Sequence, residues 1–364
     1  MKKEIKVLHT EWSDGWGGQE IRIINEMIAI REEGIEVFLA CRDNSKIKNK
    51  AIENNIKVFL LPFKGNLDFN TIYKLIKIIK EYNINIVNTH SGKDTWVGGI
   101  AAKLSGAKFI RTRHLSNIIN SSRLNFINEL SDYIFTTGES VREDMIKYNR
   151  INPNKIISIP TGIDDELFDP NKYDVVKSRQ LFNFQPDEIV IGIVAVLRQF
   201  KRHDIFINVA KKIIDEYPDK NIKFVIAGDG PQKIKLEKLI DQLDLRNKVL
   251  MLGHVTEIPT LLSALDIFLL TSDSKEGVPQ SVMQAMLMKK AVISTNVGST
   301  KDLLDKENFI LVNSEEEIFK ACVLLINNQE IRNKYCENSR NYISEKFSKK
   351  VMVNKIMKIY KELI

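Results

Sequence analysis

Residues 271–299 of the chain read TSDSKEGVPQSVMQAMLMKKAVISTNVGS, and this stretch decides the fold. The segment DIFLLTS (266–272) that leads into it is an apolar run ending in small polar residues, which is typical of a buried parallel strand at its carboxyl end. A helix is predicted from about 280 to 289, because Pro279 suits a first helical turn, and AVISTNV (291–297) predicts the next strand. The order strand, loop, helix, strand places a helix N-terminus at the carboxyl edge of a parallel sheet.

The loop and the first turn of this helix form a candidate binding site. Free N–H groups at a helix N-terminus bind phosphate well. Glu276 lies just outside the predicted helix and Gln284 about one turn inside it, so one side chain can take a sugar hydroxyl and the other a ribose hydroxyl. The other residues predicted to bind there are Gly277, Val278, Pro279, Gln280 and Ser281.

The same residues carry a family resemblance. EGVP (276–279), followed by QAM (284–286), resembles the E-x7-E segment of retaining glycosyltransferases of family 4, which have the GT-B fold. The chain departs from that segment at its second acid, because Gln284 stands where the family has a glutamate. A glutamine still accepts from and donates to a ribose diol, although it carries no charge. The resemblance implies that Glu276 binds the hydroxyls of a donor sugar and that Gln284 binds ribose.

Composition and charge bound the kind of protein. The 364 residues favour two domains, and 43% hydrophobic with 28% charged residues describes a soluble globular chain. The net charge of +7 is spread over both halves, which argues against a nucleic-acid-binding face and is compatible with weak attraction to an anionic membrane. The three cysteines lack metal spacing and indicate a reducing compartment. With no signal peptide and no apolar run near the roughly 18 residues of a membrane span, we expect a cytoplasmic chain, at or near the inner face of the cytoplasmic membrane.

A glycine-rich turn follows the first predicted strand, IKVLHT (5–10). Gly17 and Gly18 open an amphipathic helix from about 19 to 33, and glycines there let a ligand approach the main chain closely. The segment is not G-x-G-x-x-G, so it gives little support to a dinucleotide site. In the resembled family the Gly-Gly loop contacts the donor phosphate and the acceptor, which makes both glycines donor-binding candidates. A tight turn without a ligand is the alternative.

Three further strands in the first half end in polar residues. They are INIVNTHSGKD (84–94), AKFIRTRHLS (107–116) and YIFTTGES (133–140). Because the carboxyl ends of parallel strands meet at one edge of a sheet, their polar side chains predict one functional edge. His90 and Glu139 are pocket candidates there, and a purely structural histidine is the alternative. In the resembled family the histidine of the R-x-R-H-type segment contacts a hydroxyl of the donor sugar, which implies that role for His114.

The helical stretch FNTIYKLIKIIKEY (69–82) has two interpretations. Ile72, Leu75, Ile76 and Ile79 recur on one face, and the lysines fall elsewhere. A helix packed on the core accounts for this pattern, and an amphipathic helix at a membrane surface is the alternative.

The second half opens with EIVIGIVAVLRQFKRHD (188–204), a strand that runs into basic side chains. Cations beyond the carboxyl end of a strand suit a diphosphate, because they neutralise the charge that develops on a leaving group. The resembled family has an arginine and a lysine five residues apart there, in a G-R-L-x-x-x-K segment. Lys201 matches the lysine, whereas Val196 occupies the arginine position and Arg198 is offset by two residues. The resemblance implies Lys201 first and Arg198 second as catalytic cations, and two solvated surface cations are the alternative.

Strands and helices alternate through both halves of the chain. This order predicts an α/β fold of two Rossmann-like, doubly wound parallel-sheet domains, which in GT-B proteins face each other across a cleft. The predicted domains are 1–165, which binds the acceptor, and 166–345, which binds the nucleotide-sugar donor. Residues 346–364 are expected to form a helix that crosses back to the first domain. Gly228 lies where the family has G-x-G-P and is a further donor-binding candidate.

The resemblance implies a hexosyl-type glycosyltransferase. Such an enzyme moves a sugar from a nucleotide diphosphate sugar, with UDP or GDP as the nucleotide, to a glycan or lipid-linked acceptor with retention, in surface polysaccharide or lipopolysaccharide biosynthesis. Cations and the helix N-terminus would stabilise the leaving diphosphate, so we expect no metal and no cofactor. A nucleotide-sugar 2-epimerase-like enzyme is the alternative, because it shares the two-domain shape. A solute-binding protein and an NAD enzyme are less well supported, since no export signal and no dinucleotide fingerprint are visible.

Overall fold

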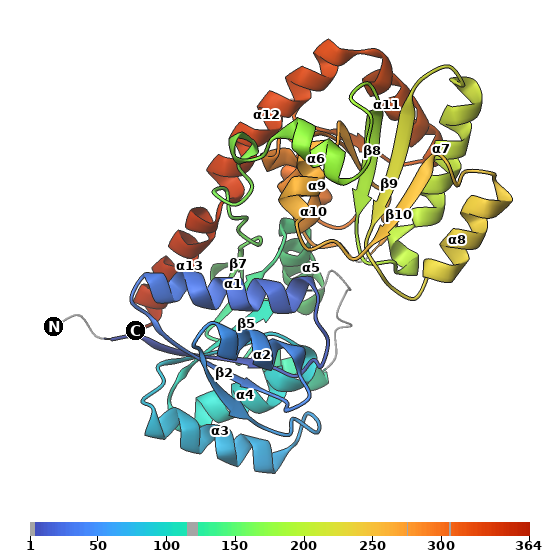
Figure 1. The fold of residues 1–364 in the computed structure, drawn as a ribbon. Coiled ribbons are helices and arrows are strands. Elements are labelled where there is room, and N and C mark those ends of the chain that lie inside the picture. The colour runs from blue at the N-terminus through green and yellow to red at the C-terminus, as the bar shows by residue number, and fades with distance from the viewer. Residues whose placement is uncertain (1–3, 115–122, 275, 306) are drawn as a thin grey trace. The chain divides into compact units, whose positions relative to one another are not determined.

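The computed structural model describes residues 4–114, 123–274, 276–305 and 307–364. The chain divides into two compact units. The first unit is Met1–Gly162 together with Lys349–Ile364, and the second is Ile163–Ser348. Each unit has a parallel sheet with helices packed on it, as Figure 1 shows.

The first unit is built on a seven-stranded sheet in the order β3-β2-β1-β4-β5-β6-β7, in which neighbouring strands run parallel. The strands are β1 Lys6–Glu11, β2 Glu36–Cys41, β3 Lys57–Leu60, β4 Ile86–Thr89, β5 Lys108–Arg113, β6 Tyr133–Thr136 and β7 Ile156–Ser158. The helices are α1 Gly18–Glu32, α2 Lys46–Glu53, α3 Phe69–Glu81, α4 Gly92–Ser105, α5 Glu139–Asn149 and α13 Lys349–Leu363, with short 3₁₀ turns at Arg123–Asn128 and Pro153–Lys155.

The second unit repeats this architecture with a six-stranded parallel sheet in the order β10-β9-β8-β11-β12-β13. The strands are β8 Ile189–Val194, β9 Ile222–Ala227, β10 Val249–Gly253, β11 Ile267–Leu270, β12 Ala291–Thr295 and β13 Ile310–Val312. The helices are α6 Val175–Leu181, α7 His203–Glu216, α8 Lys233–Gln242, α9 Ile258–Ala264, α10 Gln280–Leu287, α11 Glu315–Asn327 and α12 Gln329–Phe347, with 3₁₀ turns at Pro170–Lys172, Gln199–Lys201 and Thr300–Leu303.

Both sheets are buried on both faces, which explains the near-continuous apolar runs in the strands. Val7 and Leu8 are consecutive in β1 and point to opposite faces, so they belong to two different core clusters. Val190 and Ile191 divide in the same way between the two cores of the second unit. The α/β prediction of doubly wound parallel sheets is therefore confirmed.

Two helices of the first unit pack on its core. In α3, Ile72, Leu75 and Ile79 are buried, as the core-packed interpretation predicts. In α13, Ile356 and Tyr360 are buried in the same cluster as Val7, so the last helix of the chain completes the core of the first unit. Packing rather than intrinsic propensity holds such helices in place.

Element ends differ slightly from the predicted ones. Helix α10 ends at Leu287, two residues before the predicted end, and β5 ends at Arg113. Leu115 and Ser116, the end of the strand predicted over 107–116, lie outside the described residues. Helix and strand ends are the least certain part of any pattern argument, because capping and fraying decide them locally.

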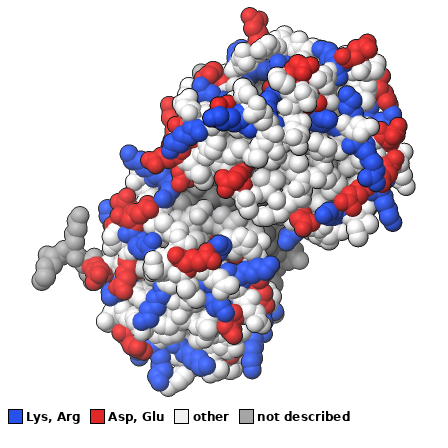
Figure 2. Space-filling model, viewed as in Figure 1, with Lys and Arg blue, Asp and Glu red and all other residues white. Residues whose placement is uncertain are grey.

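The surface mixes charges of both signs. On the face drawn in Figure 2, Lys and Arg side chains are interspersed with Asp and Glu. In the part of the chain that the structure describes, no helix combines the length and the apolar character that crossing a bilayer requires.

Candidate functional site

The first candidate cluster lies where the strand order of the second sheet reverses. β8 and β11 are neighbours, with β9 on one side and β12 on the other. Ligands of doubly wound sheets bind outside the carboxyl ends of the strands at such a switch point. Lys201 follows β8 and Glu276 follows β11, so the fold brings two residues that are 75 positions apart to this point.

Lys201 and Glu276 form an ion pair there. Nζ of Lys201 donates to Oε1 of Glu276 at 2.5 Å, and Oγ of Ser272 donates to the same oxygen at 2.5 Å. The two charged side chains are only 16% and 9% exposed, so water screens the pair weakly. Oγ1 of Thr271 donates to the carbonyl oxygens of Lys201 and Arg202, which ties the two segments together. Both of these contacts use Oε1 of the carboxylate.

Glycine at position 298 sets the backbone of Glu276. Gly298 has φ of +55°, and a Cβ atom there would lie 1.8 Å from the carbonyl oxygen of Glu276. Only glycine allows this approach in this conformation. Oγ1 of Thr295 also donates to the carbonyl oxygen of Ser272 at 2.5 Å. Ser272 and Gly298 were not among the predicted site residues, although small residues just after buried strands were a usable signal.

The helix that follows Glu276 presents its first turn beside the ion pair. Helix α10 begins at Gln280 after Pro279, and within the described residues no side chain caps it. Val278 and Pro279 are buried, while Gly277, Ser281 and Gln284 are partly exposed. The predicted loop and helix turn are thus present next to Glu276, with backbone N–H groups of the kind that hold a phosphate.

Arg198 precedes the turn that carries Lys201, but its side chain is not part of this pair. It is exposed and lines a hollow of about 210 Å³ together with Arg202, Asp204 and Gln232. The backbone N–H of Lys201 donates to the carbonyl oxygen of Arg198 at 3.0 Å, but among the described residues no hydrogen bond or ion pair joins the Arg198 guanidinium to the side chains of Lys201 and Glu276. The structure therefore pairs the side chains of Lys201 and Glu276 and leaves the exposed guanidinium of Arg198 outside the pair.

Gly228 has a structural reason to be glycine. Its φ is +150°, and a Cβ atom would lie 1.9 Å from the carbonyl oxygen of Ala195. The chain leaving β9 thereby crosses the chain leaving β8 at close range. Gly228 shapes the edge near the candidate site through its backbone.

The second cluster occupies the switch point of the first sheet, between β1 and β4. His9 is in β1, His90 directly follows β4 and His114 directly follows β5. Nδ1 of His9 is 2.9 Å from Nε2 of His90, and Nδ1 of His90 is 3.0 Å from Nε2 of His114. The structure thus brings His90 and His114 together and adds His9. His9 was not among the predicted site residues, although a histidine inside an otherwise apolar strand was a usable signal.

The three rings are neutral at ordinary pH. Burial lowers the pKa of His9 to about 3. Burial, and after it the neighbouring His9 and His114, hold the pKa of His90 well below its usual range. Burial and then the Arg22 guanidinium do the same for His114. Within the described residues, no group of three or more His, Cys, Asp or Glu side chains is arranged to hold a metal ion.

The other predicted residues of the first unit lie at the same edge of the sheet, after β1 and β6. Gly17 precedes α1 in extended backbone, and its N–H donates to Oε2 of Glu20 at 2.8 Å. Gly18 begins the helix and is exposed. Neither glycine has a positive φ, so neither position requires the left-handed backbone conformation that glycine favours. Glu139 begins α5 and pairs with Arg142.

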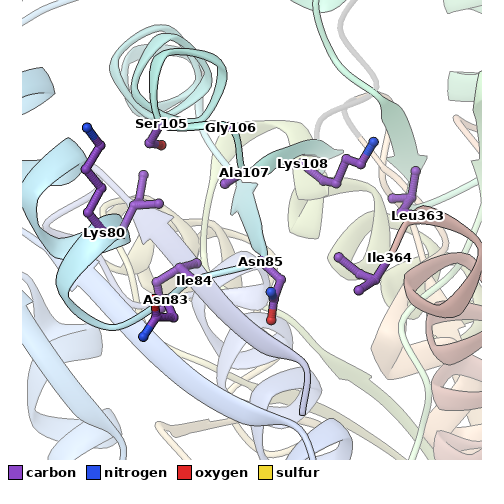
Figure 3. Close-up of a pocket in the computed structure, with 11 residues that line it drawn as sticks. Lys80, Asn83, Ile84, Asn85, Ser105, Gly106, Ala107, Lys108, Leu363 and Ile364 are labelled. Atoms are coloured by element: carbon purple, nitrogen blue, oxygen red, sulfur yellow. The ribbon is translucent and has the colours of Figure 1, made fainter. Parts of the chain in front are cut away.

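A separate hollow lies at the opposite edge of the first sheet. It measures about 420 Å³, and its lining includes Asn85, Ala107 and Ile364 (Figure 3). Asn85 and Ala107 come just before β4 and β5, so this is the amino edge. None of the predicted site residues lines this hollow.

Family models cover both units. Residues 16–167 match the model described as Glycosyltransferase Family 4, and residues 175–342 match Glycosyl transferases group 1. The chain belongs to glycosyltransferase family 4. Its GT-B fold and its activity as a glycosyltransferase follow from this membership, and the resemblance drawn from residues 276–286 is confirmed.

Individual relatives are similar to this family 4 glycosyltransferase over nearly the whole length of its chain. The UDP-Gal:alpha-D-GlcNAc-diphosphoundecaprenol alpha-1,3-galactosyltransferase of Escherichia coli is 25% identical, covering 99% of this chain and 98% of the relative. A glycosyltransferase from Rickettsia africae has a TM-score of 0.90 at 20% identity, covering 99% and 98% of the two chains. HepE from Anabaena, solved with UDP and glucose, has a TM-score of 0.83 at 18% identity, covering 99% and 100%. These relatives do not favour the 2-epimerase alternative.

Proposed function

We propose that this glycosyltransferase moves a sugar from a UDP-sugar to a lipid-linked acceptor, with retention at the anomeric carbon and without a metal ion. The observation that carries the proposal is the largely buried Lys201–Glu276 pair at the switch point of the second sheet, beside the first turn of α10. The E. coli relative is named for a UDP-sugar donor and a diphosphoundecaprenol-linked acceptor. Surface polysaccharide or lipopolysaccharide biosynthesis is the setting in which such an acceptor is used.

Each residue has one role in the proposed reaction. Lys201 and the N–H groups of α10 stabilise the diphosphate as negative charge develops on it, and Arg198 adds a second cation. Oε2 of Glu276 binds hydroxyls of the donor sugar, and Gln284 binds ribose. From the first unit, His114 contacts a sugar hydroxyl, and the backbone of the Gly17-Gly18 turn serves the donor phosphate and the acceptor. A preorganised cation and helix N-terminus supply the stabilisation that a metal ion supplies in other transferases.

A thermal-shift panel tests the donor site. The protein is heated with UDP, GDP, ADP, CMP or NAD, each with and without EDTA. We expect UDP alone to raise the melting temperature, because a ligand that binds only the folded state stabilises it, and we expect EDTA to leave the shift unchanged. Lys201→Met should remove the shift, whereas Lys211→Met, on the exposed side of α7, should keep it. A shift with NAD alone, or none with any nucleotide, would overturn the proposed donor.

Retention and metal independence need their own measurements. Product from an α-linked UDP-sugar is examined by NMR, and an α-glycoside is expected. Turnover should be unchanged after EDTA treatment. A β-linked product would refute retention, and activity abolished by EDTA and restored by manganese would refute metal independence.

We also propose that the enzyme works at the inner face of the cytoplasmic membrane and contacts it with the outward side of α3. Phe69 and Tyr73 are 75% and 60% exposed there, and Lys74 and Lys77 lie beside them, exposed. Aromatic side chains among lysines suit an anionic bilayer surface. Phe69→Ser with Tyr73→Ser should reduce cosedimentation with phosphatidylglycerol vesicles, and Leu324→Ser should not. Equal sedimentation of all three proteins would contradict this contact.

A further inference from the structure

The histidines of the first unit form a chain whose protons can be counted. Two ring-to-ring contacts of 2.9 and 3.0 Å join His9 to His90 and His90 to His114. Each contact needs one N–H donor and one bare nitrogen. Three neutral rings carry three protons, so two occupy the contacts and the third must sit at one end of the chain.

The burial of the two ends decides where the third proton sits. Nε2 of His9 is buried without a hydrogen-bond partner among the described residues. A proton there would leave a buried N–H donor unpaired, which proteins avoid more strictly than an unpaired acceptor. The other end of the chain is Nδ1 of His114. Of the three histidines, His114 alone is partly exposed. The third proton therefore belongs on Nδ1 of His114.

We propose that His9 and His90 are positioning residues that hold His114 as its Nδ1–H tautomer, with that N–H presented as a hydrogen-bond donor at the carboxyl edge of the first sheet. In this arrangement Nδ1–H of His9 donates to Nε2 of His90, and Nδ1–H of His90 donates to Nε2 of His114. The catalytic significance of the chain rests on the proposed function of His114, whereas the tautomer itself does not.

Neighbouring charged groups support a neutral chain of rings. Arg22 of α1 and Arg111 and Arg113 of β5 act on the histidines as cations and oppose a fourth proton. On the other side, Oδ2 of Asp94 accepts from the backbone N–H of His90 at 2.9 Å and so fixes the segment that carries the central ring. Glu11, the buried acid of β1, is held largely un-ionised because burial raises its pKa to about 8.

The direction of the chain restricts what His114 can recognise. An Nδ1–H group donates and cannot accept, and Nε2 is already occupied by His90. The substrate atom that faces His114 must therefore offer a lone pair, as the oxygen of a sugar hydroxyl does. A ring free to change tautomer would accept or donate a hydrogen bond equally well. The chain of histidines therefore orients His114 and also makes it discriminate between acceptor and donor groups of the substrate.

Nuclear magnetic resonance tests the tautomer without any substrate. In protein labelled with ¹⁵N-histidine, two-bond couplings identify which ring nitrogen carries the proton. We expect Nδ1–H for His9, His90 and His114, and a mixture of tautomers for His114 in His90→Phe. His90→Asn keeps an amide N–H at the position of Nδ1 and should restore a single Nδ1–H form. Nε2–H at His114 in the wild type, or no change in His90→Phe, would overturn the proposal.

A double-mutant cycle tests whether the chain acts through His114. Release of UDP from UDP-galactose is measured for the wild type, His90→Phe, His114→Phe and the double variant, after thermal unfolding has confirmed that each is folded. Each single change should lower kcat roughly tenfold or more, and the double change should be no worse than either, since groups that act as a unit are not additive. Losses that multiply would overturn the proposal. If the tautomer is as expected but His114→Phe loses no turnover, the chain stands and the proposed role of His114 fails.

Discussion

Nζ of Lys201 lies 2.5 Å from Oε1 of Glu276, although 75 residues separate the two in the sequence. The lysine follows β8 and the glutamate follows β11, which are neighbours only because the second sheet reverses its strand order there. The carboxylate holds the cation at the edge, and the cation in turn compensates a buried charge. Removing either partner leaves the other uncompensated, which is costly in a poorly solvated site.

Lys201→Met should lower turnover about 100- to 1000-fold, the range found when one donor to developing negative charge is removed. The measurement is the steady-state rate of UDP release from the UDP-sugar. Lys211→Met changes the same residue type on the exposed side of α7 and serves as the control. A Lys201→Met enzyme within threefold of the wild type would show that the lysine does not stabilise the leaving group.

Glu276→Gln should separate nucleotide binding from turnover. The amide keeps an oxygen for the Oγ–H of Ser272, and Lys201 keeps its charge for the diphosphate. We expect UDP affinity by calorimetry to stay within about threefold, and kcat to fall at least tenfold, or about 1.4 kcal/mol, because the sugar loses a charged acceptor. If UDP affinity and kcat fell together by the same factor, Glu276 would be a nucleotide residue instead.

Gly298→Ala should destabilise the second unit more than Gly253→Ala does. Both glycines have a positive φ, +55° and +68°, but a Cβ atom meets nothing within 4 Å at Gly253 and overlaps the backbone of Glu276 at Gly298. Strain alone predicts a loss of about 1–2 kcal/mol in unfolding free energy for Gly253→Ala, and the overlap adds to that at Gly298. Urea unfolding measures both, and equal losses would disprove the close approach.

The first unit should lose stability in mild acid. Unfolded histidine binds a proton near pH 6.5, whereas burial lowers the pKa of His9 to about 3 and those of His90 and His114 well below the usual value. The unfolded state then binds more protons, so the unfolding free energy falls as pH drops below about 6.5, by at most about 1.4 kcal/mol per pH unit for each histidine.

His9→Leu isolates one proton of this dependence. Between pH 6.5 and 4, the unfolding free energy of this variant should fall less steeply than that of the wild type. The reason is that about one fewer proton binds when the variant unfolds. Comparing the two proteins removes the opposite contributions of Glu11 and Asp94, whose pKa values burial raises. Parallel curves for the two proteins would show that His9 is protonated in the folded state.

Glu11→Gln should be the more stable protein at alkaline pH. Burial, and after it the nearby Asp94, raises the pKa of Glu11 from 4.5 to about 8, although Ser13 and Gln19 donate hydrogen bonds to its carboxylate. The folded state therefore holds a proton that the unfolded state releases, and the wild type loses stability as pH rises from about 4.5 to 8. Glutamine cannot ionise, so unfolding at pH 6 and pH 9 should differ less for the variant. An unchanged difference would place an ionised Glu11 in the fold.

Local pattern alone determined the strands and helices of this protein and the chemistry at their ends. Hydrophobic periodicity and continuous apolar runs predicted the parallel α/β fold. A strand that is buried on both faces of its sheet is apolar along its whole length, and this run is visible in the sequence. The spacing in EGVPQSVMQ (276–284) predicted the family, because a loop and helix turn is a local structure. The loop, its helix and the cation after β8 could therefore be predicted directly from the sequence.

Only the tertiary structure decided which of these ends meet. Strand order joins Lys201 to Glu276, and it joins His9 to His90 across 81 residues, while no local pattern says which strands are neighbours. The close approach of Gly298 to Glu276 arises in the same way. Periodicity reports whether a segment is buried, but its partners depend on how all the apolar faces pack at once, and that packing turned separate polar strand ends into two clusters.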